Sequence, residues 1–248
     1  MKLIDFFKEY PRVAIAFSGG VDSTYLLYVA KQCAIEVQAY YVKTAFQPQF
    51  ELNDALRIAN ELGTQVKILH LDVVLDERIS SNPNNRCYYC KRKLFEAIKK
   101  KAEVDGFTVV LDGTNASDDI SDRPGTKALH ELSVISPLRL CGLTKTEIRQ
   151  LSRNAGLFTW NKLAYSCLAT RISVGEQITE KKLRIIETVE NYLFSLGLSN
   201  FRVRHMGDAA KIQVSASQIE KIIENRESII AELKQYYSAV LLDLEVRE

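Results

Sequence analysis

Short apolar runs alternate with longer helical patterns along most of the sequence, and this alternation restricts the possible folds. Four runs have the length and composition of buried strands, and they lie at residues 13–17, 37–42, 65–72 and 108–111. Apolar side chains recur at helical spacing in the segments between them, at 22–31, 51–62 and 91–105. Strands that alternate with helices of this length predict an α/β fold with a parallel sheet covered on both faces.

The predicted sheet is extended by two further elements. Residues 134–136 suit a short fifth strand, and a capping box of Thr144 and Glu147 predicts a helix that ends at Gly156. After residue 175 the order of elements changes. Helices are then expected at 179–196 and 215–235, with strands at 201–205, 211–214 and 239–244. We therefore expect two domains, a larger one at 1–175 and a small α+β domain at 176–248.

Composition restricts the class of protein. With 248 residues, 46% hydrophobic and 26% charged, the chain matches a globular protein and excludes collagen-like or largely disordered ones. No apolar run reaches the roughly 18–20 residues of a membrane span, and the first residues carry no secretion signal, so we expect a cytoplasmic protein. A net charge of only +2 argues against a dedicated nucleic-acid binder.

The strongest functional motif is SGGVDST, which joins the first predicted strand to its helix. Gly19 and Gly20 let the backbone turn sharply and approach a ligand, and the following helix N-terminus attracts an anion. Ser18 and Ser23 can donate hydroxyl hydrogen bonds to phosphate oxygens. Asp22 would repel a bare phosphate, so its presence indicates a bridging Mg²⁺. The motif predicts a phosphate-binding loop, the alternative being an ordinary serine-capped turn.

The loop lacks the lysine of a G-x-x-x-x-G-K-[ST] motif. SGGVDS instead resembles the PP-loop of the ATP pyrophosphatases, which implies a doubly wound α/β fold and ATP binding by these residues, Val21 included. It also implies cleavage of ATP between the α and β phosphates, adenylation of a substrate and release of pyrophosphate. A second polar loop, LDGTNASDD, follows a later strand. PP-loop enzymes have a similar loop beside the nucleotide, so the resemblance assigns ATP binding to Gly113 and Asn115.

Three of the five cysteines lie in motifs that suggest a metal or catalytic site. Cys87 and Cys90 form a C-x-x-C directly before a predicted basic helix, whose N-terminus would favour thiolates. Cys167 lies further on, in YSCLATR. Three interpretations stay open. A zinc site would need further ligands, and no histidine has a suitable spacing; a redox dithiol would leave the third cysteine without a role. An iron–sulfur cluster held by three cysteines would have one open iron. Cys33 and Cys141 are interpreted as packing residues.

The order of SGGVDS, CYYCK, DRPG and SCLATR, followed by RVRHMGDAAKIQV, is similar to that in the LarE family. These are ATP-dependent sulfur transferases of nickel-pincer nucleotide synthesis, and the resemblance covers essentially the whole chain. It implies adenylation of a carboxylate of a pyridinium dicarboxylate mononucleotide and its conversion to a thiocarboxylate. Asp22 and Cys167 would be catalytic. Within DRPG, Asp122 and Arg123 are weaker candidates, because this segment also suits a turn.

Two branches of that family differ in their cysteines. In one, a single cysteine at the position of Cys167 gives up its own sulfur, and in the other three cysteines resemble those of cluster-dependent thiolases. Cys87, Cys90 and Cys167 place the chain in the second branch. The resemblance then implies a [4Fe-4S] cluster whose fourth iron carries a sulfide that attacks the acyl adenylate. It also implies a sulfide or sulfur donor as partner, and a homo-oligomer.

A nucleotide substrate needs a site for its own phosphate. Arg202 and Arg204 alternate on a predicted strand, so both point to one face. Arginine can bind a phosphate through two parallel hydrogen bonds. Arg171, four residues after Cys167, is a third candidate. The alternative is that the two strand arginines only face solvent.

Other functions remain open at this point. PP-loop proteins with a C-x-x-C and a third cysteine also thiolate tRNA, although the net charge of +2 and the lack of an added RNA-binding module argue against this. An ammonia-using ligase of the NAD or GMP synthetase kind would need none of the three cysteines. A nucleotide-binding regulator is a more distant alternative. We therefore expect a small-molecule substrate, with neither a membrane nor a nucleic acid as partner.

Overall fold

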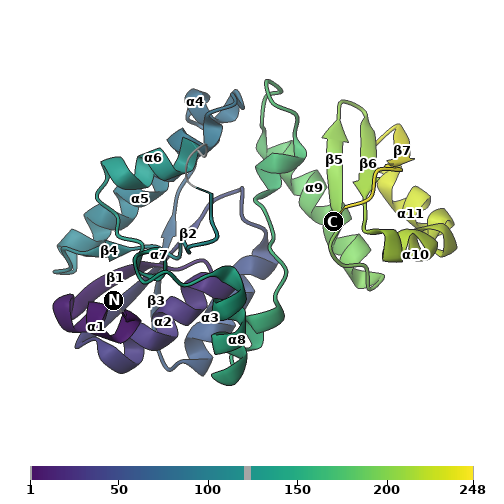
Figure 1. The fold of residues 1–248 in the computed structure, drawn as a ribbon. Helices are drawn as coiled ribbons and strands as arrows, with labels where there is room; N and C mark the ends of the chain where they lie inside the picture. The colour runs from purple at the N-terminus through teal and green to yellow at the C-terminus, as the bar shows by residue number, and fades with distance from the viewer. Residues whose placement is uncertain (1, 120–123, 248) are drawn as a thin grey trace. The chain divides into compact units, whose positions relative to one another are not determined.

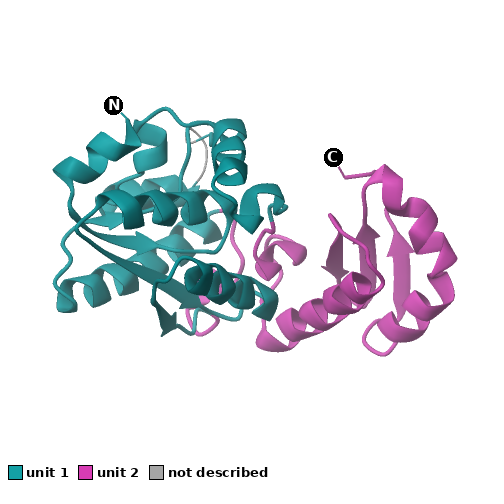
Figure 2. Cartoon of the chain, turned by 90° about the horizontal axis from the view of Figure 1, so that it is seen from below, with its two compact units in different colours: residues 1–73, 85–164 teal, residues 74–84, 165–248 magenta. Residues whose placement is uncertain are grey.

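The computed structural model describes residues 2–119 and 124–247, and it divides into two compact units (Figures 1 and 2). The first comprises Met1–Val73 and Asn85–Ala164, and the second Val74–Asn84 and Tyr165–Glu248. The second unit thus begins before residue 175, and it includes a segment from far upstream. Backbone hydrogen bonds explain this, since Gly175 N donates to Asn82 O at 2.8 Å and Ile178 N donates to Ser80 O at 2.7 Å.

The first unit contains the expected parallel sheet. Its strands are β1 (Arg12–Ala16), β2 (Glu36–Lys43), β3 (Val66–His70) and β4 (Val110–Leu111), in the order β3-β2-β1-β4. The α/β fold is therefore confirmed. The fifth strand expected at 134–136 is reduced to a single bridge between Ile135 and Leu111. The chain leaves the sheet there, because a short helix begins at Pro137.

Helices precede, connect and follow these strands. They are α1 (Leu3–Glu9), α2 (Val21–Cys33), α3 (Gln49–Glu61), α5 (Arg86–Val104), α6 (Pro124–Glu131), α7 (Pro137–Leu140) and α8 (Lys145–Asn154), followed by the 3-10 turn η1 (Phe158–Asn161). The capping box at the start of α8 is present, with the Thr144 hydroxyl accepting from Glu147 N and the Glu147 carboxylate accepting from Thr144 N. Helix α5 begins earlier than expected, which places the C-x-x-C inside its first turns.

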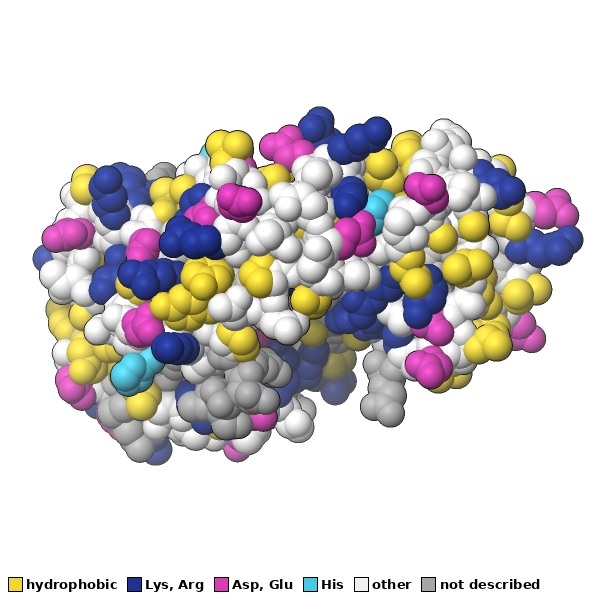
Figure 3. All heavy atoms as spheres, turned by 90° about the horizontal axis from the view of Figure 1, so that it is seen from above, with side chains coloured by type: hydrophobic (Ala, Val, Ile, Leu, Met, Phe, Trp, Pro, Cys, Tyr) yellow, Lys and Arg dark blue, Asp and Glu magenta, His cyan; other side chains and the backbone are white. Residues whose placement is uncertain are grey.

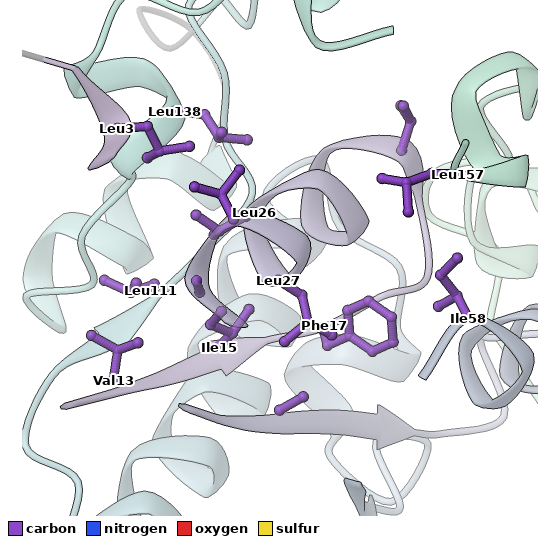
Figure 4. Packing of buried hydrophobic residues seen from close by; sticks show 14 of the residues in the cluster. Leu3, Val13, Ile15, Phe17, Leu26, Leu27, Ile58, Leu111, Leu138 and Leu157 are labelled. Atoms are coloured by element: carbon purple, nitrogen blue, oxygen red, sulfur yellow. The ribbon is translucent and has the colours of Figure 1, made fainter. Parts of the chain in front are cut away.

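Helices cover both faces of the sheet because successive residues of β1 point in opposite directions. Ile15 belongs to a buried cluster with Leu26 and Leu27 of α2 (Figure 4). Ala14, the preceding residue, belongs to a different cluster that includes Phe95 and Ile98 of α5. The sheet is thus doubly wound, and such a sheet presents the carboxyl ends of its strands to a ligand.

The second unit is the expected small α+β module. It consists of α4 (Glu77–Ser80), η2 (Leu168–Arg171), α9 (Glu180–Ser195), β5 (Arg202–Met206), β6 (Ala209–Gln213), η3 (Ala216–Gln218), α10 (Ile219–Glu224), α11 (Arg226–Leu233) and β7 (Ala239–Leu242). Strands β5 and β6 are antiparallel, whereas β6 and β7 are parallel. The core contains Val189 and Leu193 of α9 with Val203 and Ile212 of the sheet.

One prediction for this unit is wrong. The single helix expected at 215–235 is broken into η3, α10 and α11. The break between α10 and α11 lies at Asn225, whose side-chain amide donates to the backbone oxygen of Lys221 at 2.8 Å. Asparagine competes in this way with the hydrogen bonds of a continuous helix.

Candidate functional site

The SGGVDST motif forms the turn from β1 into α2, as expected. Gly19 has φ +71°, and a Cβ there would lie 2.8 Å from the Cα of Ala55 on α3, so both conformation and space require glycine. Gly20 is the N-cap of α2, and among the described residues no side chain caps the helix there. The N-terminal turn of α2 therefore keeps backbone N–H groups that can bind an anion.

The two serines of the motif hold the turn together. The hydroxyls of Ser18 and Ser23 are 3.0 Å apart, Ser18 N donates to the Ser23 hydroxyl at 3.2 Å, and Gly20 N donates to the Ser18 hydroxyl at 3.4 Å. Both hydroxyls thus lie within the turn, and that of the buried Ser23 also donates to the Gly20 backbone oxygen at 3.3 Å. A hydroxyl rotates readily, so each can exchange such a contact for a phosphate oxygen.

The second predicted loop lies directly beside the first. A Cβ on Gly113 would come within 3.0 Å of Ser23 N, so the two backbones approach closely. The Asn115 side chain is buried and its amide donates to the Asp22 carboxylate at 3.3 Å, while its oxygen accepts from Ser117 N at 2.8 Å. The structure thus brings together the residues assigned to ATP from the sequence, at the carboxyl edge of β1 and β4.

A buried carboxylate anchors this second loop to the end of β4. Asp112 is only 6% exposed, and it accepts hydrogen bonds from the hydroxyls of Ser136, at 2.6 Å, and Thr114. Arg139 on α7 supports the same loop by donating to the backbone oxygens of Asn115 and Asp118. Ser136 and Arg139 therefore fix this loop from outside it, and Thr114 adds a hydrogen bond within it.

Two lysines at the loop were missed by sequence reasoning. Lys145, the first residue of α8, forms an ion pair with Asp22 at 2.5 Å. Lys162 donates to the backbone oxygen of Gly19 at 3.5 Å and pairs with Glu51 at 3.0 Å and Asp54 at 2.8 Å. The capping box located the helix that carries Lys145, but no local pattern connects either lysine with a loop more than a hundred residues away.

These lysines change the electrostatics of the loop. The negative charge of Asp22, which by itself suggested Mg²⁺, is matched here by Lys145. Lys162 has a side chain only 14% exposed, between the acidic residues of α3 and the loop. Burial raises the pKa of Glu51, and the adjacent Lys162 opposes that rise.

Cys87 and Cys90 belong to the first unit. They lie within the first turns of α5, one helical turn apart, so both side chains share one face of the helix. Cys87 is exposed and Cys90 is half-buried. The guanidinium of the buried Arg86 lies 3.7 Å from the Cys87 sulfur. Arg86 therefore places a positive charge beside the Cys87 sulfur.

Cys167 belongs to the second unit, where it is the N-cap of η2. The segment around it is organised by Arg171, whose guanidinium donates to the Ser166 backbone oxygen at 2.7 Å, to the Ser166 hydroxyl at 2.8 Å and to the Thr170 hydroxyl at 3.0 Å. The other side of the same guanidinium forms two hydrogen bonds with Glu190, at 2.9 and 3.0 Å.

Arg171 and Glu190 form a buried ion pair, with each side chain 1% exposed. Glu190 also accepts from Val203 N at 2.8 Å and from the Tyr165 hydroxyl. Burial raises the pKa of that tyrosine, and the neighbouring Glu190 raises it further. Because the donors of Arg171 are used within the chain, its geometry favours positioning of the Cys167 segment over direct contact with a substrate phosphate.

Arg202 and Arg204 lie on the same half-buried side of β5. Arg204 donates to Gln213 at 2.8 Å and to the backbone oxygen of Thr170. Burial, followed by the charges of Arg247, Arg171 and Arg204, lowers the pKa of Arg202 to about 10. Excess positive charge is therefore concentrated around Arg202 on this side of β5.

Arg247 is a member of this arginine group that sequence reasoning missed. Its Nε atom is buried without a hydrogen-bond partner among the described residues. The sequence offers no signal for it, because it lies at the far end of the second unit, after β7.

The described residues bear in two ways on the predicted catalytic and metal-binding residues. Asp122 and Arg123 lie outside the described residues. Among those that are described, no three His, Cys, Asp or Glu side chains form a group that could hold a metal ion. Cys87 and Cys90 belong to one unit and Cys167 to the other. The five cysteines all belong to the described residues, and none of them forms a disulfide bond.

The described residues also bear on the expected partners. No helix among them has both the length and the apolar character needed to cross a membrane. On the face drawn in Figure 3, Lys and Arg side chains are interspersed with Asp and Glu.

Comparison with known proteins identifies the family. The family model described as queuosine biosynthesis protein QueC matches residues 12–86, which include the phosphate loop. An uncharacterized protein of Synechocystis sp. is 36% identical over 98% of this chain and 92% of its own length. The pyridinium-3,5-bisthiocarboxylic acid mononucleotide synthase of Lactiplantibacillus plantarum is 31% identical over 98% and 89%.

A third relative, an uncharacterized protein of Methanocaldococcus jannaschii, is 30% identical over 95% of this chain and 90% of its own length. These matches extend through both units, so they include the phosphate loop and the segments around all three motif cysteines. The chain belongs to the LarE family within the PP-loop ATP pyrophosphatases.

Proposed function

We propose that this chain is an ATP-dependent sulfur transferase that converts a carboxylate of a pyridinium dicarboxylate mononucleotide to a thiocarboxylate. The observation that supports the proposal is the glycine turn into the uncapped N-terminus of α2, which lies beside Asn115 and suits an anion. Membership in a family that includes a bisthiocarboxylic acid mononucleotide synthase supports the sulfur chemistry and the substrate class.

In this proposal the loop residues bind the triphosphate of ATP. Backbone N–H groups of Gly19, Gly20 and Val21 face the phosphates, and the hydroxyls of Ser18 and Ser23 donate to phosphate oxygens. Gly113 and Asn115 line the same site from the second loop. Asp22 suits Mg²⁺, because this ion commonly takes one or two protein carboxylates together with substrate phosphate oxygens. Asp22 accepts from Asn115 through one carboxylate oxygen and pairs with Lys145 through the other, so an ion bound here would share these oxygens with those two side chains.

The proposed first step activates the acceptor. A carboxylate oxygen of the mononucleotide attacks the α-phosphorus of ATP, the bond to the bridging oxygen breaks, and pyrophosphate leaves. The product is an acyl adenylate whose acyl carbon then accepts a sulfur nucleophile, and AMP leaves. The protein contributes by holding the two reactants in line and by placing positive charge at the phosphates as charge shifts to pyrophosphate.

The substrate phosphate is assigned to the arginine group of the second unit. Arg202 and Arg204 are half-buried on one side of β5, and Arg247 adds a third positive charge. Arginine suits phosphate because its planar fork forms two hydrogen bonds at once. Arg171, the third candidate from the sequence, contributes in this proposal by holding Thr170 and Ser166 in place.

The sulfur is assigned to a [4Fe-4S] cluster held by Cys87, Cys90 and Cys167. Three thiolates are suitable ligands for such a cluster, and the C-x-x-C on one face of α5 can bind two of its irons. When bound, the cluster would supply an open iron as carrier of an external sulfide. The assignment requires that Cys167 of the second unit meet the two cysteines of the first.

Anaerobic purification tests the cluster directly. Iron and acid-labile sulfide are measured in the wild type and in Cys87→Ala, Cys90→Ala and Cys167→Ala, with Cys33→Ala and Cys141→Ala as matched controls. We expect about four irons per chain in the wild type and the two controls, and loss of iron in the three motif variants. A wild-type chain without iron after anaerobic reconstitution would refute the cluster. Dehydroalanine at position 167 after turnover would then indicate sacrifice of the cysteine.

Adenylation is tested separately by pyrophosphate release. We expect Mg-ATP to yield pyrophosphate only when a pyridinium dicarboxylate mononucleotide is present, and the Cys167→Ala variant to retain this step while forming no thiocarboxylate. Equal pyrophosphate release with tRNA, or amide formation with ammonia, would instead support the tRNA thiolation or the ligase alternative.

A further inference from the structure

Helix α8 carries two basic residues that bear on the phosphate loop, and one of them contacts it directly. Lys145 and Arg149 are four residues apart, so they lie on the same side of the helix. Lys145 pairs with Asp22 in the loop. Arg149, one turn later, donates from one terminal nitrogen to the backbone oxygen of Trp160 at 2.6 Å and from the other to that of Lys162 at 2.8 Å.

These two carbonyls lie at the end of the 3-10 turn η1, just where the chain passes the phosphate loop. The planar guanidinium of Arg149 therefore fixes the backbone on both sides of Asn161. From this fixed backbone the Lys162 side chain extends to within 3.5 Å of the Gly19 oxygen.

The Lys162 side chain is held on its other side by α3. It pairs with Glu51 and Asp54, and its side chain is only 14% exposed. A lysine has a flexible stem and a compact charge, so it needs such constraints to stay directed at one place. Its charge lies at the glycine of the loop that has no room for any side chain of its own.

We propose that Lys162 and Lys145 bind the triphosphate of the nucleotide at this loop, and that Arg149 is a positioning residue that directs Lys162 there. This deepens the proposed function and rests on it, because it names residues that recognise the ATP phosphates. The arrangement supplies the cation that the loop lacks within its own motif. This positive charge comes from residues distant in the sequence, Lys145 and Lys162, instead of from the helix that follows the glycines.

A double-mutant cycle tests the inference. Affinity for Mg-ATP is measured by equilibrium dialysis for the wild type, Lys162→Gln, Arg149→Gln and the double variant. A hydrogen bond to a charged group predicts that Lys162→Gln weakens ATP binding about 10- to 100-fold. Arg149→Gln is expected to weaken binding less. If Arg149 acts through Lys162, adding Arg149→Gln to Lys162→Gln causes no further loss.

Conservative variants and a matched control separate positioning from folding. Lys162→Arg keeps the charge and should retain most of the affinity, and Arg149→Lys should restore part of it. Arg153→Gln is the control, because Arg153 lies one turn further on α8 and contacts the ring of Trp160, at 4.9 Å from its centroid, without reaching these carbonyls. It should leave ATP affinity unchanged. Unfolding transitions of all variants identify any that fail to fold.

The outcomes distinguish this inference from the function on which it rests. Wild-type affinity in a folded Lys162→Gln variant would overturn the lysine assignment. Fully additive losses in the cycle would overturn the positioning role of Arg149. Failure of the wild-type chain to bind Mg-ATP would overturn the proposed function and this inference together. Normal wild-type binding with normal binding in every variant would overturn only the inference.

Discussion

Replacing Gly19 by alanine should damage the first unit by two separate effects. The residue has φ +71°, a left-handed conformation that costs a side-chain-bearing residue about 1–2 kcal/mol. The new Cβ would also lie 2.8 Å from the Cα and 2.9 Å from the Cβ of Ala55, so backbone must move on α3 or in the loop. Overpacking of this kind costs about 1–3 kcal/mol. We therefore expect Gly19→Ala to reduce the free energy of unfolding by about 2–5 kcal/mol.

Gly63 offers a matched control for this substitution. It has φ +58° and follows the end of α3, but a Cβ there would find nothing within 4 Å. Gly63→Ala should therefore cost only the conformational part, about 1–2 kcal/mol. The difference between the two variants isolates the contact with Ala55. ATP affinity should fall in Gly19→Ala alone, since only that glycine lies in the phosphate loop.

The assay is urea unfolding followed by tryptophan fluorescence. The chain has one tryptophan, and Trp160 lies in the first unit, so its emission reports that unit without the second. We expect a lower midpoint for Gly19→Ala than for Gly63→Ala at similar slopes. Equal midpoints for the two variants would refute the argument from close packing, and unchanged ATP affinity in Gly19→Ala would refute the assignment of the loop.

Three further predictions concern other parts of the chain. Glu190→Gln should reduce the free energy of unfolding of the second unit by about 3–5 kcal/mol, because it leaves the Arg171 cation buried without its carboxylate partner. Denaturant unfolding followed by circular dichroism measures this loss, and a loss below about 1 kcal/mol would contradict the prediction. Hydrogen bonds from lysine and tyrosine hold the pKa of Asp105 well below its usual range, so its contribution to stability is present above about pH 4 and is lost as pH falls further. The stability difference between wild type and Asp105→Asn should accordingly shrink between about pH 4 and pH 2, and a difference that stays constant would argue against it. Arg202→Ala should raise KM for the mononucleotide about tenfold with little change in kcat, and steady-state kinetics in which only kcat falls would remove Arg202 from the phosphate site.

Most of the fold follows from local patterns. Runs of apolar residues predicted β1, β2 and β3, and the Thr144 capping box predicted the start of α8. The errors occur where neighbours override local preference. Asn225 breaks a helix whose apolar spacing continues through it, and Ile135 forms only one bridge because a helix begins two residues later.

The site divides in the same way. The glycine turn and the second loop with Asn115 could be located without coordinates, because each is a contiguous segment that follows a strand of one parallel sheet. The sequence also determined the family, through motifs that recur in order along the whole chain. Such signals are readable without coordinates because glycine turns, helix caps and parallel strand ends act over a few residues.

The distant side chains that reach these loops became visible only in the folded chain. Lys145 reaches Asp22 across 123 residues and Lys162 reaches Gly19 across 143. The fold also made Arg171 an internal partner of Glu190. Sequence periodicity reports which face of an element a residue occupies, but it contains no information on which other element packs there. That choice depends on the packing of whole helices and sheets.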